Sequence, residues 1–295
     1  MGDSCCEHKM KSSEITNANT LRYIRFIVKD KKNAKPQTGI LKTFHFSAEH
    51  PQQILVLDKS PFEEGFGIVH VGHKTIPLED VKILAPTVPS KIIGIGLNYK
   101  DHALEQGKQL PQEPYVFLKA VSALLNPRET VKLNRYCTDV HFEAELAVVI
   151  GKPCYNTSEK DALDYIAGYT IANDVTDRVI QKKELTYARA KGMDTFCPLG
   201  PYLVHFVDDD TNNADMNWKN KTIRTWINGE LKQDGNTNDM VFSVPYLIHY
   251  VSQFMTLYPG DVILTGTPKG TAALKSGDKV KIEIQDFGIL EHAVE

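Results

Sequence analysis

The sequence has few of the features that mark secreted, membrane-spanning or nucleic-acid-binding proteins. Its 295 residues include only five cysteines, irregularly spaced and without a Cys-x-x-Cys pair, which indicates a reducing compartment rather than a disulfide scaffold. No apolar run approaches the roughly 20 residues of a membrane-spanning helix. The formal net charge of -3 provides no basic excess for binding nucleic acid non-specifically. We therefore expect a soluble protein with neither a membrane nor a nucleic acid as partner.

The first twenty residues lack the usual marks of a targeting segment. They have no apolar core, and they contain Asp3, Glu7 and Glu14, so they resemble neither a signal peptide nor an arginine-rich transit peptide. Their polar composition predicts a disordered tail over residues 1–20.

The rest of the chain has the composition of an ordinary globular enzyme, with 42% hydrophobic and 24% charged residues. Its length suits one large domain with a smaller one. Short strands over residues 21–28, 53–57 and 67–71, separated by polar turns, predict a small β-rich N-terminal domain over 21–88. A catalytic domain is expected over 89–295.

The second domain is also expected to be mainly β, which gives an α+β fold class. Strands are predicted at 91–96, 115–119, 141–151, 167–174, 262–265 and 279–284. Asn228-Gly229 predicts a hairpin turn, and 245–255 an amphipathic helix. Asn98 is expected to cap a short helix over 99–106. On the strand after it, at 115–119, Lys119 shares a face with Phe117 and is expected to be partly buried.

Two carboxylates, Glu143 and Glu145, stand two residues apart at the head of an apolar run. In a strand, such side chains project from the same face. Neighbouring buried carboxylates raise each other's pKa unless positive charge lies between them, and a divalent cation with hard oxygen ligands is the simplest solution. An exposed strand face is the alternative. Asp174, at the end of another strand, is a candidate third ligand or else a turn-capping residue.

His102 and Glu105 are i, i+3 neighbours on the expected short helix. Such a pair can activate a water or accept a carbon-bound proton, although it can also be an ordinary surface salt bridge. The loop at 266–270 offers backbone N–H groups and hydroxyls to an anion such as a carboxylate, or is a plain strand-end turn. Three further residues, taken alone, indicate only surface polar positions: Arg178, Gln181 and Lys191.

Several motifs follow one another in a fixed order: Gly96-x-Asn98-Tyr99-x-Asp101-His102, Glu143-x-Glu145-Leu146, Asp174-Val175-Thr176, Lys191-x-x-Asp194-Thr195-Phe196-Cys197-Pro198, Asn228-Gly229-Glu230 and Pro259-Gly260-Asp261-Val262-Ile263-Leu264-Thr265-Gly266-Thr267-Pro268. In this order they resemble the fumarylacetoacetate hydrolase superfamily, and most of all its domain-containing protein 2 branch. The resemblance covers about residues 89–295 and, more loosely, 21–88.

The resemblance implies a barrel-like or β-roll catalytic domain, usually in a homodimer. It implies Mg²⁺ or Mn²⁺, held by Glu143, Glu145 and Asp174. Ca²⁺, which also prefers oxygen ligands, is a third candidate for the same residues. The remaining matches assign roles as follows: the helical lid carries His102 and Glu105, the active-site lysine is Lys191, Arg178 and Gln181 contact an oxoacid, and the Thr-Gly-Thr loop is Thr265, Gly266 and Thr267.

The chain departs from the family pattern at two places. After the third ligand the family usually reads Asp-x-Ser/Thr-Ala-Arg-Asp, whereas this chain reads Asp174-Val175-Thr176-Asp177-Arg178-Val179. The loop at 268–273 lacks the common Gly-Val-Gly. These changes are expected to affect substrate choice or lid closure rather than metal ligation.

The implied activity is chemistry on a small 2-oxo acid through a metal-stabilised enolate. The branch resemblance favours keto–enol tautomerisation of oxaloacetate. Oxaloacetate decarboxylation and acylpyruvate C–C hydrolysis share this chemistry, and the residues alone do not rank the three. A catalytically silent member that binds a small acid is a fourth reading, against which the retained carboxylates and His–Glu pair count. The branch also suggests mitochondria, with a cytoplasmic location left open.

Overall fold

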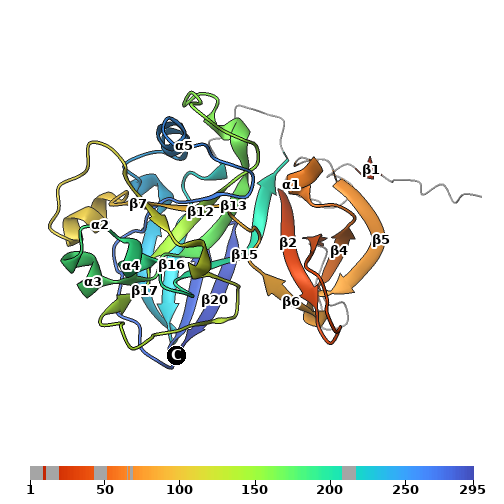
Figure 1. The fold of residues 1–295 in the computed structure, drawn as a ribbon, viewed down its shortest axis with the longest axis horizontal. Helices are drawn as coiled ribbons and strands as arrows, with labels where there is room; N and C mark the ends of the chain where they lie inside the picture. The colour runs from red at the N-terminus through yellow and green to blue at the C-terminus, as the bar shows by residue number, and fades with distance from the viewer. Residues whose placement is uncertain (1–8, 11–19, 43–51, 65, 67–68, 208–216) are drawn as a thin grey trace, which may run out of the picture.

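The computed structural model describes residues 9–10, 20–42, 52–64, 66, 69–207 and 217–295. Figure 1 shows two lobes that meet where β2 lies beside β15. The N-terminal lobe contains β1 (Lys9–Met10), β2 (Thr20–Val28), β3 (Gln37–Leu41), β4 (Gln53–Leu57), α1 (Pro61–Glu64), β5 (Val69–Pro77), the 3₁₀ helix η2 (Leu78–Asp80) and β6 (Val81–Leu84).

The larger lobe follows in chain order. Its elements are β7 (Ile92–Gly96), α2 (Lys100–Glu105), β8 (Tyr115–Lys119), η3 (Val121–Ala123), β9 (Leu124–Leu125), β10 (Thr130–Val131), β11 (Val140–His141), β12 (Ala144–Ile150), η4 (Ala162–Tyr165), β13 (Ile166–Asn173), β14 (Thr176–Asp177), α3 (Arg178–Lys183), α4 (Ala188–Lys191), β15 (Cys197–Phe206), β16 (Thr222–Ile227), β17 (Glu230–Asn236), η6 (Thr237–Asp239), α5 (Val244–Ser252), β18 (Val262–Leu264), β19 (Lys279–Ile284) and β20 (Gly288–Val294). The expected mainly β fold is confirmed.

One hydrogen-bonded sheet runs through both lobes. Its main path is β1-β5-β4-β3-β2-β15-β13-β12-β18-β7-β8, with β6 on β2 and β9 on β15. A second sheet has the order β10-β20-β19-β16-β17. The junction is antiparallel, with Tyr23 opposite Leu203 and Arg22 opposite Val204. Backbone pairing therefore crosses the boundary expected near residue 88.

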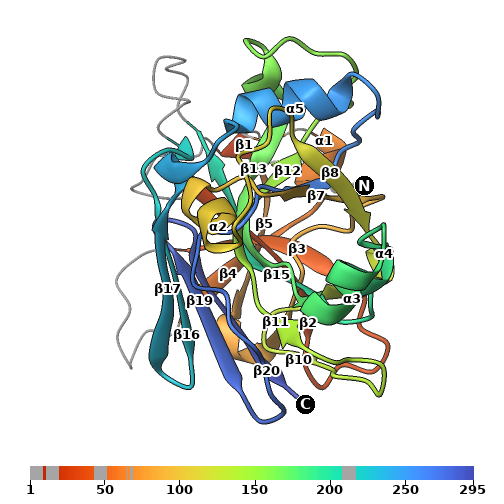
Figure 2. The same cartoon turned by 90° about the vertical axis from the view of Figure 1, so that its left-hand side faces the viewer.

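Strand β12 lies at the centre of the core, and all of its residues are buried. It pairs with β13 on one side and β18 on the other. A continuous apolar run is the pattern of a strand that is covered on both faces. Helices α2, α3 and α4 gather on the side of the large lobe away from the N-terminal lobe, and in Figure 2 they face the viewer.

Most of the expected elements are present, with small shifts at their ends. The hairpin at Asn228-Gly229 has positive φ at both residues, 53° and 87°, as a type I′ turn requires. The strand expected from residue 67 is described from Val69 onward. Of the expected disordered tail, only Lys9, Met10 and Thr20 are described, and Lys9–Met10 form a strand on β5, since a sheet edge offers unpaired backbone groups.

Asn98 does not cap α2, contrary to the sequence expectation. The N-cap residue is Tyr99, which makes no side-chain cap bond. The Asn98 amide instead donates to Thr265 O at 2.8 Å and accepts from Phe242 N at 2.7 Å. Because Asn98 is buried beside backbone groups that need partners, this tertiary requirement outweighs local capping. It anchors the start of α2 to the loop after β18.

None of the described helices is long and apolar enough to cross a membrane. Cys137, Cys154 and Cys197 are free thiols.

Candidate metal and proton-transfer site

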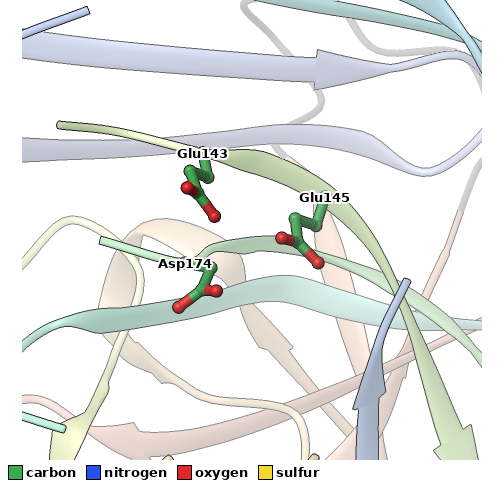
Figure 3. Close-up of side chains that lie close together, drawn as sticks. All are labelled: Glu143, Glu145 and Asp174. Carbon is green, nitrogen blue, oxygen red and sulfur yellow. The ribbon is translucent and has the colours of Figure 1, made fainter. Parts of the chain in front are cut away.

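The register of β12 and β13 brings together three carboxylates that are distant in sequence. Ala144 pairs with Asn173, so the next pair outward is Glu143 and Asp174, whose N–H donates to Glu143 O at 2.9 Å. Opposed residues and their i+2 neighbours share one face of a sheet. Consequently one oxygen of each of Glu143, Glu145 and Asp174 lies within 4.8 Å of the others, and Figure 3 shows the three side chains converging.

Two of these carboxylates are neutralised by buried cations. Lys191 Nζ lies 2.8 Å from Glu143 Oε2 and 2.5 Å from Asp174 Oδ2. Arg178 pairs with Glu143 at 2.5 Å, and Lys119 with Asp174 at 2.5 Å. Burial alone would raise the pKa of Glu143, but Lys191 and then Arg178 hold that pKa below its ordinary value.

Glu145 is different, because no ion pair to it is formed by the residues that the structure describes. Its carboxylate is 1% exposed and accepts the Gly266 N–H at 2.6 Å. Burial, then the charges of Asp174 and Glu143, raises the pKa of Glu145 well above its ordinary value. An unpaired buried carboxylate is costly, and a divalent cation among three carboxylates would remove that cost. The all-oxygen donor set therefore fits Mg²⁺, Mn²⁺ or Ca²⁺.

Gly266 lies in a conformation and a space that favour glycine. Its φ is +96°, and a Cβ would lie 2.9 Å from Asn98 Cβ. The loop was expected to offer its N–H groups and hydroxyls to a ligand, but the Gly266 N–H is directed at Glu145 and the Thr265 hydroxyl donates to Leu146 O at 2.8 Å. Of the three loop residues, Thr267 is the one that lines the cavity.

The predicted dyad lies across the cavity on α2. His102 is 4% exposed, and its Nδ1 lies 3.4 Å from Glu105 Oε2. The Glu105 carboxylate also accepts the Gly270 N–H at 3.2 Å, which ties the helix to the loop after β18. Burial lowers the pKa of His102, opposed by the charge of Glu143, so the imidazole is neutral at neutral pH and able to accept a proton.

The cavity between the dyad and the carboxylates is small, about 20 Å³, which is room for about one water. Most of the predicted site residues line it: His102, Glu143, Glu145, Arg178, Gln181, Lys191 and Thr267. A larger hollow of about 650 Å³ lies over Trp226 and Lys281 on the five-stranded sheet. None of the predicted site residues lines that hollow, so we place the site at the smaller cavity.

Several residues of the site were not predicted to act there. Lys119 was expected only to be partly buried, yet it is fully buried against Asp174. Gln106 and Lys108 line the cavity from the segment after α2, and Tyr187 lines it from beside α4. The alternating pattern of residues 115–119 predicted that Lys119 is partly buried. No local sequence pattern predicted that Gln106 or Lys108 lines the cavity.

Comparisons with known proteins identify similar sequences along most of the chain. Residues 91–295 match the family described as fumarylacetoacetate (FAA) hydrolase C-terminal, and 21–86 match an Rv2993c-like N-terminal family. An uncharacterized protein of Methanocaldococcus jannaschii is 47% identical over 206 residues, 70% of this chain and 83% of that protein. A mitochondrial oxaloacetate tautomerase of Xenopus laevis is 40% identical over 253 residues, 82% of this chain and 77% of its own.

Solved structures show the same fold. The crystal structure of 2-hydroxyhepta-2,4-diene-1,7-dioate isomerase from Mycobacterium marinum superposes with a TM-score of 0.78 at 35% identity, covering 93% of this chain and 98% of that one.

Proposed function

The chain belongs to the fumarylacetoacetate hydrolase superfamily, and on this premise we propose that it is a divalent-metal-dependent oxaloacetate keto–enol tautomerase. The observation that carries the proposal is that three buried carboxylates and a neutral imidazole line or adjoin one cavity. The names of the Xenopus laevis and Mycobacterium marinum relatives, a tautomerase and an isomerase, support a proton shift over bond cleavage.

Glu143, Glu145 and Asp174 would hold the cation. When bound, Mg²⁺ or Mn²⁺ would supply positive charge to the 2-oxo and carboxylate oxygens of the acid. Arg178 and Lys191 add fixed positive charge at the same cavity, where negative charge develops during enolisation. Gln181 accepts a hydrogen bond from Arg178 at 3.0 Å, and both side chains line the cavity that the acid would enter.

His102 moves the proton. Its unprotonated ring nitrogen takes a proton from C3 of the keto acid, the C–H electron pair forms the C2–C3 double bond, and the same proton is returned to the 2-oxo oxygen to give the enol. The reverse sequence gives the keto form. Glu105, facing the other ring nitrogen, keeps that nitrogen protonated and holds the ring in place.

The test is an assay of purified protein with Mg²⁺ on enol-oxaloacetate, followed by ultraviolet absorbance, with pyruvate measured in parallel. Enol decay faster than the uncatalysed rate, without pyruvate, is expected. Pyruvate released in step with enol loss contradicts the proposal in favour of decarboxylation, and cleavage of an acylpyruvate alone favours hydrolysis. Metal binding without turnover of either substrate indicates a silent acid-binding protein.

The dyad is tested by His102→Asn. The rate should fall at least about 100-fold, as expected for loss of a general base, while Mn²⁺ affinity measured by calorimetry stays unchanged. His249→Asn on α5 is the matched control. A His102→Asn rate close to wild type contradicts the assignment.

We also propose a homodimer, which light scattering tests by a mass of twice the 33.1 kDa chain. Because the Xenopus laevis relative is named mitochondrial, we propose a mitochondrial or cytoplasmic location, which cell fractionation tests.

A further inference from the structure

Gln106 contacts the ring that we assign to proton transfer. It is the residue after α2, one turn beyond His102, and it caps the helix through its backbone N–H to His102 O. Its side-chain Nε2 lies 2.8 Å from Nε2 of His102. Gln106 also lines the cavity that His102 and the carboxylates share.

The positions of the protons follow from the two neighbours of the ring. The Glu105 carboxylate, which can only accept when ionised, faces Nδ1 at 3.4 Å. The 3.4 Å contact is long for a hydrogen bond. The negative charge of the Glu105 carboxylate nevertheless favours a proton on Nδ1 over a lone pair there. In a neutral ring Nε2 is then the acceptor, so the Gln106 amide N–H donates to it. A reversed amide would leave the Nδ1 lone pair facing a carboxylate.

This bond occupies the nitrogen that has to accept the substrate proton. The cavity has room for about one water, at about 20 Å³, so a four-carbon acid has to displace a lining side chain. Arg178 is fixed by Glu143, Gln181 and Thr271, and Lys191 by three acceptors.

By contrast, the Gln106 side chain makes a single hydrogen bond to the part of the chain that the structure describes, the one to His102. It is therefore held by fewer contacts than Arg178 or Lys191, and moving it uncovers Nε2 of His102.

We propose that Gln106 is a positioning residue of this site: its amide N–H donates to the unprotonated Nε2 of His102 in the ligand-free protein, and the side chain swings aside when the acid enters. The capping depends only on the geometry of α2, whereas the release step rests on the proposed function.

Two substitutions of Gln106, each nearly equal to glutamine in size, test whether its side chain donates to Nε2 of His102. Gln106→Met removes the donor, and Gln106→Glu replaces it with a carboxylate, so that acceptors face both ring nitrogens. Glu143 and Arg178 also act on His102, Lys108 and Lys191 line the same cavity, and all four are unchanged in both variants. Gln109→Met and Gln109→Glu, at an exposed position of the same segment, are the matched controls.

The first measurement is nitrogen-15 NMR of histidine-labelled protein near neutral pH without substrate, with His102 assigned by loss of its signal in His102→Asn. We expect Nε2 to be unprotonated in the wild type, the Gln109 variants and Gln106→Met, and protonated in Gln106→Glu. A protonated Nε2 in the wild type, or an unprotonated one in Gln106→Glu, overturns the proposal.

The second measurement is steady-state turnover of enol-oxaloacetate. Gln106→Met should keep kcat within about threefold, whereas Gln106→Glu should lose at least about tenfold in kcat with a smaller change in KM. Repulsion of an anionic substrate would instead act mainly on KM, and a Gln106→Glu variant changed only in KM contradicts the release step. If the expected NMR pattern is found without any turnover, the capping stands and the tautomerase proposal fails.

Discussion

At the scale of single residues, Glu145 is the carboxylate that most needs a cation. Glu143 and Asp174 are paired with lysine and arginine, whereas Glu145 accepts a backbone N–H. This difference predicts that Glu145→Gln and Glu143→Gln change the free energy of unfolding of the metal-free protein differently.

Glu145→Gln should leave the metal-free protein as stable as wild type or more stable, because it removes a buried carboxyl group that forms no ion pair with the described residues. The same variant should bind Mn²⁺ more weakly by more than about 100-fold, beyond the loss typical of groups that only support a ligand. Urea unfolding without metal and calorimetry with Mn²⁺ measure the two effects.

Glu143→Gln is the contrasting variant. It removes the negative charge that pairs with Lys191 and Arg178. The free energy of unfolding without metal should therefore fall by about 3 kcal/mol. Equal destabilisation by Glu143→Gln and Glu145→Gln would contradict the assigned charge pattern.

His292 is linked to Glu143 through Asn173. Its Nε2 accepts from Asn173 Nδ2 at 2.9 Å, and Asn173 Oδ1 accepts the Glu143 N–H at 2.9 Å. Burial lowers the pKa of His292 from 6.5 to about 4. Between these values the unfolded chain binds a proton that the folded protein does not, so stability falls as pH decreases.

We therefore expect His292 to account for a loss of up to about 3 kcal/mol in the free energy of unfolding between pH 6.5 and 4. His292→Gln, whose amide oxygen can still accept from Asn173, should show a smaller loss. Urea unfolding at several pH values compares the two proteins, and identical pH slopes contradict this role.

At the scale of elements, the loop after β18 joins the three carboxylates to helix α2. Gly266 donates to Glu145, Gly270 donates to Glu105, and Asn98 holds Thr265. The loop therefore positions both halves of the site.

Gly266→Ala should destabilise the protein and weaken Mn²⁺ binding, since the Cβ would lie 2.9 Å from Asn98 Cβ. Gly277→Ala is the matched control, because Gly277 has a similar φ of +94° with nothing within 4 Å of a Cβ. Both variants bear the conformational cost of positive φ, about 1 kcal/mol. We expect an additional loss of at least about 1 kcal/mol for Gly266→Ala, measured by urea unfolding, and equal losses would contradict the packing argument.

At the scale of the whole molecule, the sheet is continuous from β1 to β8, and its lobes share the β2–β15 ladder. The sequence has two tryptophans, Trp218 and Trp226, and both belong to the larger lobe. Their fluorescence therefore reports on that lobe, whereas far-ultraviolet circular dichroism reports on both.

We expect the two signals to give coincident urea transitions, because a shared ladder couples the lobes. A circular dichroism transition at lower urea than the fluorescence transition would show that the N-terminal lobe unfolds independently. Leu21→Ala, at a fully buried position of the junction, should shift both transitions together.

The sequence by itself determined the features that depend on local periodicity. The spacing of Glu143 and Glu145 placed both on one strand face, the strand before Asp174 placed it at an end, and Asn228-Gly229 set the hairpin. Each of these three features depends on residues only a few positions apart. The mainly β fold follows from many local patterns of the same kind along the chain.

Tertiary structure alone decided which charges meet. Lys119 reaches Asp174 across 55 positions of sequence, and Asn98 serves Thr265 and Phe242 instead of its own helix. Among the residues that the structure describes, none forms an ion pair with Glu145, which accepts the Gly266 N–H instead. The physical reason is that a buried polar group takes whichever partner the packed chain brings within reach, and no local pattern encodes that choice.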